Sequence, residues 1–298
     1  MSCSLCSILR LLFQRQKRKY LKNQVVLITG AGMGIGKEMV HQFSSLGCVV
    51  VMWDIRKDLI DALAAEINMT SISNQPRVFA VQCDVSSRES VNAAAKLTLA
   101  NVPQVDVIIN NAGIVSGKLF SELTTTNIQR TMGVNFFGGC FTLQEFLPAM
   151  LSRKSGHVVT VSSVMGILPG AGLTDYCASK FAVVGFARSL RLELKKLSGG
   201  TVKSTLICPF AINTGMFHGI KTNFQWLFPI LEPRDVAQRI VEAVQYEEEI
   251  VVMPALLGLV ARIMPILPLC LQDFIGEQCG AMDGMDSFVG RHENANSK

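Results

Sequence analysis

The sequence is poor in the residues and patterns that mark metal sites and disulfide scaffolds. Only four of its 298 residues are histidines, and they form no ligand cluster, so we expect no metal site. The nine cysteines show neither paired C-x-x-C spacing nor the density of a small secreted scaffold, and most lie in apolar or helical runs. This pattern indicates free thiols in a reducing, cytosol-facing environment.

Charge is also scarce, at 17% of residues, and the positive excess is confined to one end. Six of the 28 basic residues fall within residues 1–22, which contain no acid, and removing them leaves 22 basic residues against 23 acidic ones. A near-neutral body lacks the basic surface that binds nucleic acid, so we expect no nucleic-acid partner. The 49% share of hydrophobic residues predicts instead that some apolar surface meets a membrane, a partner or a lipid-like ligand.

Long uninterrupted apolar runs are missing as well. The apolar stretch from Leu5 to Phe13 contains Arg10 and is far shorter than the ~20 residues that span a bilayer. Its basic residues follow the apolar part, whereas those of a cleavable signal precede it. We interpret residues 1–22 as a short interfacial anchor, with a frayed tail as the alternative.

Near the other end, residues 250–272 are almost wholly apolar but contain Arg262 and three prolines, which argue against a single spanning helix. A core strand followed by a core helix fits this stretch, and so does an amphipathic segment that lies on a membrane or lines an apolar pocket. The residues after Gly280 turn polar, which predicts a loosely ordered tail. We therefore assign residues 255–298 to an apolar extension and a polar tail.

Between these ends, apolar β-rich runs alternate with helical stretches, and no repeat or long linker interrupts them. Such alternation predicts one α/β domain over residues 23–254, a doubly wound parallel sheet of the Rossmann type. Ser86 with Glu89 forms a capping-box pattern that opens one of the helices. The expected strands cover residues 24–30, 48–54, 78–84, 105–113, 156–163, 202–209 and 249–254.

A glycine-rich turn, "TGAGMGIG" at 29–36, follows the first expected strand and opens a helix. Gly30, Gly34 and Gly36 allow a sharp turn, close approach to a pyrophosphate and tight packing of the helix on the sheet. Their spacing is G-x-x-x-G-x-G instead of G-x-G-x-x-G, but the strand–turn–helix context is the one that a dinucleotide site requires.

Three further positions at the ends of strands fit the same cofactor. Asp54 can accept hydrogen bonds from both ribose hydroxyls of an adenosine and would repel a 2′-phosphate, which favours NAD over NADP. Arg56 and Lys57 moderate that preference, and an N-cap of the next helix is the alternative role for Asp54. Asp84 can bond the adenine edge, and the "NNAG" run at 110–113 ends in a glycine that admits a cofactor ring.

Tyr176 is one of only three tyrosines, and Lys180 lies four positions later, on the same face of an expected helix. Alone, the pair indicates an amphipathic helix with a snorkelling lysine. Beside a nicotinamide site it fits an acid–base couple. An ammonium and the positive ring of NAD⁺ would lower the pKa of the phenol from its usual value near 10.

Taken together and in order, these motifs resemble the short-chain dehydrogenase/reductase family over residues 24–216. Finer phrases such as "YCASKFAVVGF" and "CPFAINTGMF" resemble its membrane-attached branch of epidermal retinol dehydrogenases and some 17β-hydroxysteroid dehydrogenases. One departure is Phe210, where many members have glycine. The motifs that carry the resemblance are "TGAGMGIG", Asp84, "NNAG", Asn135 in "GVNFFG", Ser163 in "VSSVMG", and Tyr176 with Lys180 in "YCASK".

The resemblance implies a role for each matching residue. Tyr176 would exchange a proton with the substrate oxygen, and Ser163 would hold that oxygen, with neighbouring Ser162 as the alternative. Asn135 would bind a water that relays protons through Lys180, which also contacts the ribose. The residues implied in cofactor binding are Gly30, Gly34, Ile35, Gly36, Asp54, Asp84, Asn111, Ala112, Gly113, Tyr176, Lys180, Pro209 and Thr214.

The segment after Thr214 is aromatic and apolar, with Met216, Phe217, Phe224, Trp226, Leu227 and Phe228. It suits a lipid-like alcohol, retinol first and a steroid or long-chain alcohol next, although plain packing explains it equally well. We expect an oxidoreductase that transfers a hydride between NAD(H) and such a substrate. The alternative is a catalytically silent NAD-binding or lipid-surface protein. We expect a peripheral protein on the cytosolic face of the endoplasmic reticulum membrane or on a lipid droplet, with the cytoplasm as the alternative and a homodimer left open.

Overall fold

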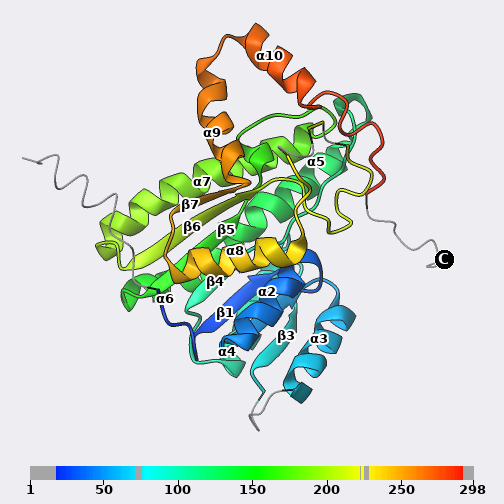
Figure 1. The fold of residues 1–298 in the computed structure, drawn as a ribbon. Coiled ribbons are helices and arrows are strands. Elements are labelled where there is room, and N and C mark those ends of the chain that lie inside the picture. Colours follow the sequence, from blue (N-terminus) through cyan, green and yellow to red (C-terminus); the bar gives the residue numbers. More distant parts are fainter. Residues whose placement is uncertain (1–17, 71–75, 222, 225–227, 291–298) are drawn as a thin grey trace, which may run out of the picture.

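A seven-stranded, all-parallel sheet forms the centre of the protein, and its strand order is β3-β2-β1-β4-β5-β6-β7. The computed structural model describes residues 18–70, 76–221, 223–224 and 228–290. Each expected strand is present and helices cover both faces (Figure 1), so the predicted single-domain, doubly wound sheet is confirmed. The strands are β1 (Val25–Thr29), β2 (Val49–Asp54), β3 (Val78–Gln82), β4 (Val107–Asn110), β5 (Gly156–Val161), β6 (Val202–Pro209) and β7 (Ile250–Met253).

Two apolar cores, one on each face of the sheet, hold these layers together. Along β1, Val26 and Ile28 face one core while Val25 and Leu27 face the other, as expected for a strand buried on both sides. The helices are α2 (Gly34–Ser45), α3 (Lys57–Thr70), α4 (Arg88–Asn101), α5 (Thr125–Met132), α6 (Gly138–Ser152), α7 (Thr174–Ser198), α8 (Pro233–Gln245), α9 (Ala255–Ile263) and α10 (Leu269–Gln278). Shorter turns are η1 (Phe120–Glu122), the π-helical η2 (Gly133–Phe137), η3 (Val164–Gly166) and η4 (Met264–Ile266).

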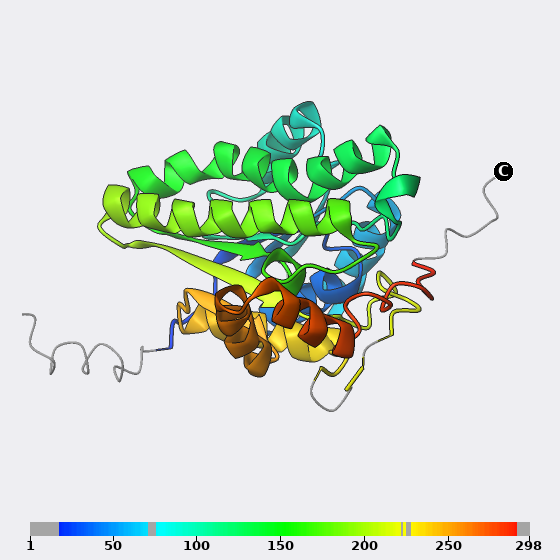
Figure 2. The ribbon, with the colours of Figure 1, turned by 90° about the horizontal axis from the view of Figure 1, so that it is seen from above.

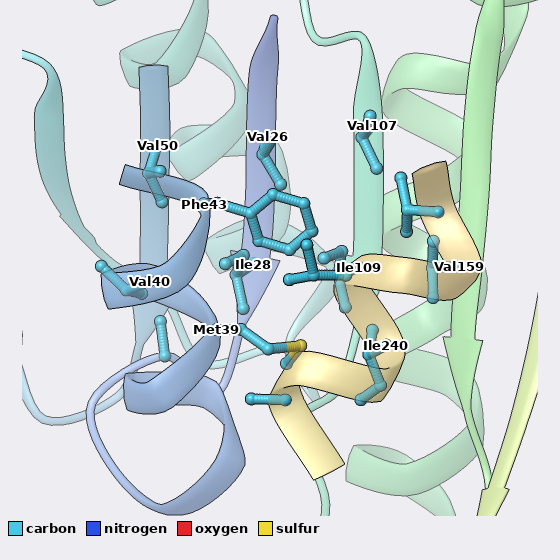
Figure 3. Packing of buried hydrophobic residues seen from close by; sticks show 14 of the residues in the cluster. Val26, Ile28, Met39, Val40, Phe43, Val50, Val107, Ile109, Val159 and Ile240 are labelled. Atoms are coloured by element: carbon cyan, nitrogen blue, oxygen red, sulfur yellow. The ribbon is translucent and has the colours of Figure 1, made fainter. Parts of the chain in front are cut away.

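Helices α2 and α8 pack on the first face beside each other (Figure 3). Met39 and Phe43 of α2 and Ile240 of α8 are fully buried against the valines and isoleucines of the central strands. Truncating a buried phenylalanine such as Phe43 costs about 3–5 kcal/mol, so this packing fixes the start of α2 relative to β1. That start is the predicted phosphate-binding turn.

The N-terminus of α4 differs from the prediction by one residue. Ser87, not Ser86, is the N-cap, and its hydroxyl accepts a hydrogen bond from the Ser90 amide at 3.2 Å. The Ser86 hydroxyl donates instead to the Asp84 carboxylate at 2.7 Å. The predicted capping box at Ser86 is therefore wrong, because Asp84, two residues after β3, accepts the Ser86 hydroxyl.

The two ends of the chain differ in how they meet this body. Residues 1–17, most of the predicted anchor, lie outside the described residues, whereas Leu21 is buried in the core. After β7, helices α9 and α10 project from the body (Figure 1), and the chain then returns to it. The loosely ordered tail expected after Gly280 is wrong for residues 281–290, which pack on the body through apolar side chains. Within the described residues, no helix combines the length and apolar character needed to cross a membrane.

Candidate active site

The strand order places a ligand crevice at the carboxyl ends of β1 and β4. The chain turns to opposite sides of the sheet after these two neighbours, which is where doubly wound folds bind ligands. A cavity of about 260 Å³ lies there. Its wall includes Asp54 at the end of β2 and Ser163 just after β5, three strand positions and hence about 14 Å apart.

The glycine positions of the turn have no room for a side chain. A Cβ on Gly36 would overlap the carbonyl oxygen of Gly30, and one on Gly30 would lie 2.9 Å from the Ala112 Cα. Gly30 and Gly34 have φ of +65° and +53°, in the left-handed region that favours glycine. Met33, the N-cap of α2, makes no side-chain hydrogen bond to the helix. The first backbone amides of α2 can therefore bind an anion. This cradle fits the pyrophosphate of a dinucleotide.

Asp54 is held in place by backbone amides while remaining in the cavity wall. Its two carboxylate oxygens accept hydrogen bonds from Gly32 at 2.8 Å and from Arg56 at 3.0 Å. Each oxygen keeps a second lone pair for a ribose hydroxyl. Because α3 begins at Lys57, Asp54 shapes the turn before that helix and is not its N-cap. Sequence reasoning missed Gly32, whose Cβ would lie only 3.0 Å from this carboxylate.

The "NNAG" run joins β4 to β1 as well as lining the cavity. The Asn111 side-chain amide donates to the carbonyls of Thr29 at 2.9 Å and Gly30 at 3.1 Å. In return, the buried Thr29 hydroxyl accepts the amides of Asn111 and Ala112. Sequence reasoning missed Thr29, which fixes the floor of the cavity. Asp84 also lines the cavity, with its carboxylate bonded to Ser86.

Tyr176 and Lys180 stand one turn apart at the start of α7, and each is only 4% exposed. The Lys180 ammonium donates to the Val161 carbonyl at 3.2 Å and lies 5.7 Å from the centre of the Tyr176 ring. Burial lowers the pKa of Lys180 to about 8. Burial also raises the pKa of Tyr176, partly offset by a hydrogen bond with the Ser163 hydroxyl.

The pKa of Tyr176 is raised in the protein alone, whereas the lowered pKa predicted from the sequence includes the positive ring of bound NAD⁺ and stays a prediction. Loss of hydration of the phenolate is the largest effect, and the Lys180 ammonium is directed to the Val161 carbonyl. In the protein alone the phenol therefore keeps its proton across the physiological range.

The two serines after β5 face different partners. The Ser163 hydroxyl reaches Tyr176 and also the Pro209 carbonyl, at 3.4 Å. The Ser162 hydroxyl instead donates to the backbone carbonyl of Lys180 at 3.1 Å. Ser163 is thus the serine beside the phenol, and Ser162 holds α7 against the sheet.

Asn135 lies behind the cavity wall, in the π-helical turn η2. Its side-chain oxygen accepts the Ile114 amide at 2.8 Å, and its nitrogen donates to the Ile114 carbonyl and to the Ser179 hydroxyl. A Cβ on Gly113 would lie 3.5 Å from the Asn135 oxygen and 3.6 Å from the Lys180 ammonium. The glycine therefore keeps the space between these two groups free.

A buried acid next to Tyr176 was missed from the sequence. The Asp175 carboxylate accepts hydrogen bonds from the hydroxyls of Ser116 at 2.6 Å and Thr131 at 2.7 Å, and from the Tyr176 amide at 2.8 Å. These bonds tie the first turn of α7 to α5 and to the loop after β4. The signal was an acid in the first turn of a helix, where it also complements the helix dipole.

The remaining predicted cofactor residues come together at the same cavity. Ile35, Pro209 and Thr214 line it, and the Thr214 methyl would lie 3.0 Å from a Cβ on Gly34. Of the expected lid, Met216 and Phe217 line the cavity, whereas Phe228 packs in a separate cluster. Trp226 and Leu227 lie outside the described residues.

Comparison with known proteins identifies the family. The family described as short chain dehydrogenase matches residues 24–224, which include the glycine turn, Ser163, Tyr176 and Lys180. The chain belongs to this family. It is an oxidoreductase of the short-chain dehydrogenase/reductase type and uses a nicotinamide cofactor.

Relatives of this short-chain dehydrogenase include retinol dehydrogenases. Epidermal retinol dehydrogenase 2 of Homo sapiens is 40% identical over 91% of this chain and 87% of its own. Retinol dehydrogenase 10-B of Danio rerio is 36% identical over 89% of this chain and 85% of its own. A short-chain dehydrogenase/reductase from Burkholderia phymatum, solved with NAD, superposes with a TM-score of 0.74 at 25% identity, covering 89% of this chain and 98% of its own.

Proposed function

We propose that this protein is an NAD-dependent dehydrogenase/reductase of lipophilic alcohols and carbonyl compounds, with retinol and retinal as first candidates and steroids or long-chain alcohols next. The observation that carries the proposal is the meeting of Ser163, Tyr176 and Lys180 at one cavity, three strand positions away from Asp54. The retinol dehydrogenases among its relatives and the aromatic wall at Phe217 support the substrate class.

In the proposed mechanism, Tyr176 is the acid–base group. It takes the proton of the substrate hydroxyl during oxidation and returns it to the carbonyl oxygen during reduction. The Ser163 hydroxyl holds the substrate oxygen beside the phenol. The Lys180 ammonium, 5.7 Å from the centre of the ring, together with the positive ring of bound NAD⁺ would favour the phenolate that takes this proton. Bound NAD⁺ would accept the hydride from the alcohol carbon.

Asn135 has a positioning role in this scheme. Its side chain is bonded to Ile114 and Ser179, which fixes the turn η2 beside Lys180, and there Asn135 would hold a water that relays protons through Lys180. Asn135, Ser163, Tyr176 and Lys180 are all buried, which keeps bulk water away from the proton that Tyr176 transfers.

Cofactor choice rests on the charges around the predicted ribose site. The Asp54 carboxylate would bond both ribose hydroxyls and repel a 2′-phosphate. Lys57 is paired with Asp61 at 2.6 Å, and Arg56, two residues after Asp54, is the basic residue of the cavity wall nearest to it in the sequence. We expect Asp54→Ala to shift the ratio of kcat/KM for NAD⁺ over NADP⁺ at least tenfold toward NADP⁺. A wild-type enzyme that already prefers NADP⁺ contradicts this assignment.

The proposal is tested by following reduction of NAD⁺ with a panel of retinoid, steroid and aliphatic alcohols. Tyr176→Phe should lower kcat at least ~1,000-fold while leaving the Kd for NAD⁺ within twofold. Tyr20→Phe, at a tyrosine exposed on the surface, is the matched control and should keep wild-type activity. Normal turnover by Tyr176→Phe refutes the mechanism. NAD⁺ binding without turnover of any alcohol favours the catalytically silent alternative.

We also propose a peripheral membrane location, on the cytosolic face of the endoplasmic reticulum or on a lipid droplet. The support is the projecting arm of α9, η4 and α10. In flotation with phospholipid vesicles, the pair Ile266→Glu and Leu269→Glu should reduce bound protein several-fold. The same changes at Leu97 and Leu99 of α4 form the control. Equal flotation of both variant pairs contradicts a role for the arm. Exposed apolar residues of the arm are Leu256, Leu259, Ile263, Ile266, Leu269, Leu271 and Phe274.

A homodimer is a further proposal. Phe137 in η2 and Phe181 in α7 are large, exposed apolar side chains on neighbouring elements, which suits a contact with a second copy. Sedimentation of the detergent-free protein tests it. A monomer at micromolar concentration contradicts it.

A further inference from the structure

The segment that covers Tyr176 comes from much later in the chain. Residues 279–290, here called the C-terminal strap, follow α10 and run beside residues 215–221, here called the closing segment, which follow β6. Both views show the red strap next to the yellow closing segment (Figures 1 and 2).

Backbone hydrogen bonds tie the strap to its neighbours on two sides. The Lys221 amide donates to the Gly284 carbonyl at 3.0 Å, and the Val289 amide donates to the His218 carbonyl at 2.9 Å. On the other side, the Ala171 amide donates to the Ala281 carbonyl at 2.9 Å. The strap therefore links the closing segment to the loop between η3 and α7.

A series of rings connects the strap to the candidate acid–base group. Phe217 of the closing segment lies edge-on to Tyr176, with ring centres 5.5 Å apart at 81°. Phe288 of the strap in turn contacts Phe217, with ring centres 6.5 Å apart at 63°. Met285 packs on the cluster formed by Leu173, Tyr176 and Cys177. Phe217 thus forms the cavity wall next to Tyr176, and the strap packs against Phe217 from outside the cavity.

Two glycines of the body lie where the strap side chains pack, which indicates a specific position for the strap. A Cβ on Gly117 would overlap the Phe288 ring, and one on Gly172 would lie 2.9 Å from the Met285 Cβ. Both glycines have positive φ, at +64° and +70°, so both backbone shape and space are arranged for the two strap side chains.

We propose that Met285 and Phe288 form the outer wall of the substrate-binding end and determine which alcohols reach Tyr176. This inference rests on the proposed function. A lipophilic substrate has to move Phe217 aside to bring its oxygen to Tyr176, and its apolar part then meets the two strap side chains. A flexible thioether and an aromatic ring are well suited to that contact.

The experiment compares Met285→Ala and Phe288→Ala with Met282→Ala and Phe274→Ala, which remove the same side chains from exposed positions. The first readout is the rate of Cys177 alkylation by iodoacetamide, mapped by mass spectrometry. Cys177 is 8% exposed, lies in the cluster that Met285 covers, and has a pKa raised by burial, so the wild-type rate is low. We expect at least tenfold faster alkylation in the two strap variants and the wild-type rate in the controls.

The second readout is substrate discrimination. The strap variants should raise the ratio of kcat/KM for a rigid steroid alcohol over that for decan-1-ol by about tenfold or more, as pocket enlargement by a side chain does. Their Kd for NAD⁺ should stay within twofold of wild type, since neither residue lines the described cofactor cavity. Circular dichroism and urea unfolding establish that each variant is folded.

Unchanged alkylation in folded strap variants overturns the proposal, and so does faster alkylation with unchanged discrimination, because the strap would then cover the site without selecting substrates. A wild-type protein that oxidises no alcohol refutes the proposed function instead. Alkylation of Cys177 then still decides whether Met285 and Phe288 cover Tyr176.

Discussion

Replacing Lys180 by methionine should make the protein more stable while removing its activity. The side chain is 4% exposed, and burial lowers its pKa from 10.5 to about 8. A difference of about 2.5 pKa units corresponds to about 3 kcal/mol that the folded state loses by keeping the buried ammonium charged at pH 7. The lost hydrogen bond to Val161 offsets about 1 kcal/mol of this. Methionine has a similar length and is apolar, so the net gain is about 2 kcal/mol.

The stability advantage of Lys180→Met should decrease as the pH rises. The unfolded chain binds the lysine proton up to its ordinary pKa of 10.5, whereas the folded chain releases it near 8. The penalty on wild type is complete below pH about 8, shrinks as pH rises, and is gone above about 10.5. The advantage of Lys180→Met over wild type should follow the same course.

Urea unfolding of the cofactor-free protein, followed by tryptophan fluorescence, measures this difference. Trp53 is a suitable reporter, because it is fully buried and its indole N–H donates to Thr98 at 2.9 Å. Lys195→Met, at an exposed position of the same helix, is the matched control and should change stability little at any pH. A Lys180→Met protein less stable than wild type, or a gain that does not change between pH 7.5 and 10, refutes the reasoning.

Three further predictions concern other parts of the site and core. Gly36→Ala should weaken NAD⁺ binding at least tenfold in calorimetry, because its Cβ would displace α2 from the Gly30 carbonyl. Gly185→Ala, which meets nothing within 4 Å, should bind normally and speaks against this account if it is equally impaired. His157→Gln should reduce the loss of unfolding free energy that wild type shows as the pH falls below 6.5. Burial lowers the pKa of His157 to about 3, so wild type loses about 2 kcal/mol between pH 6.5 and 4.5 as the unfolded chain takes up the proton, and an unchanged slope in urea titrations would contradict this. Ser163→Ala should lower kcat/KM about 100-fold or more, whereas Ser162→Ala should mainly affect stability, and the reverse order would exchange their roles.

The strands and the glycine turn could be predicted because their signals are local. Runs of valine and isoleucine bounded by glycine or aspartate specify a buried parallel strand without any knowledge of its neighbours. Boundaries were less accurate where a side chain turns back on the backbone. The fourth strand was expected over 105–113 but ends at Asn110, because Asn111 bonds the carbonyls of Thr29 and Gly30 and leaves the sheet.

The parts that sequence reasoning missed depend on contacts between distant segments. Asp175 receives hydroxyl groups from two separate elements, and the direction of the Tyr176 pKa follows from how completely the fold encloses it. The C-terminal strap is the clearest case. Its mixed composition resembles a polar tail, and only the structure reveals that Met285 and Phe288 pack against Gly117 and Gly172.

The late position of the strap has a consequence for how the protein is made. A ribosome translates the cofactor turn, Tyr176 and every strand of the sheet before it reaches the strap, which follows α10. Translation thus separates two events in time: the nucleotide cleft can fold while the chain is still growing, and the reacting oxygen is enclosed only when the strap emerges. A chain stalled before the strap would accordingly be expected to bind the cofactor while the outer side of Phe217 and Tyr176 still lacks Met285 and Phe288.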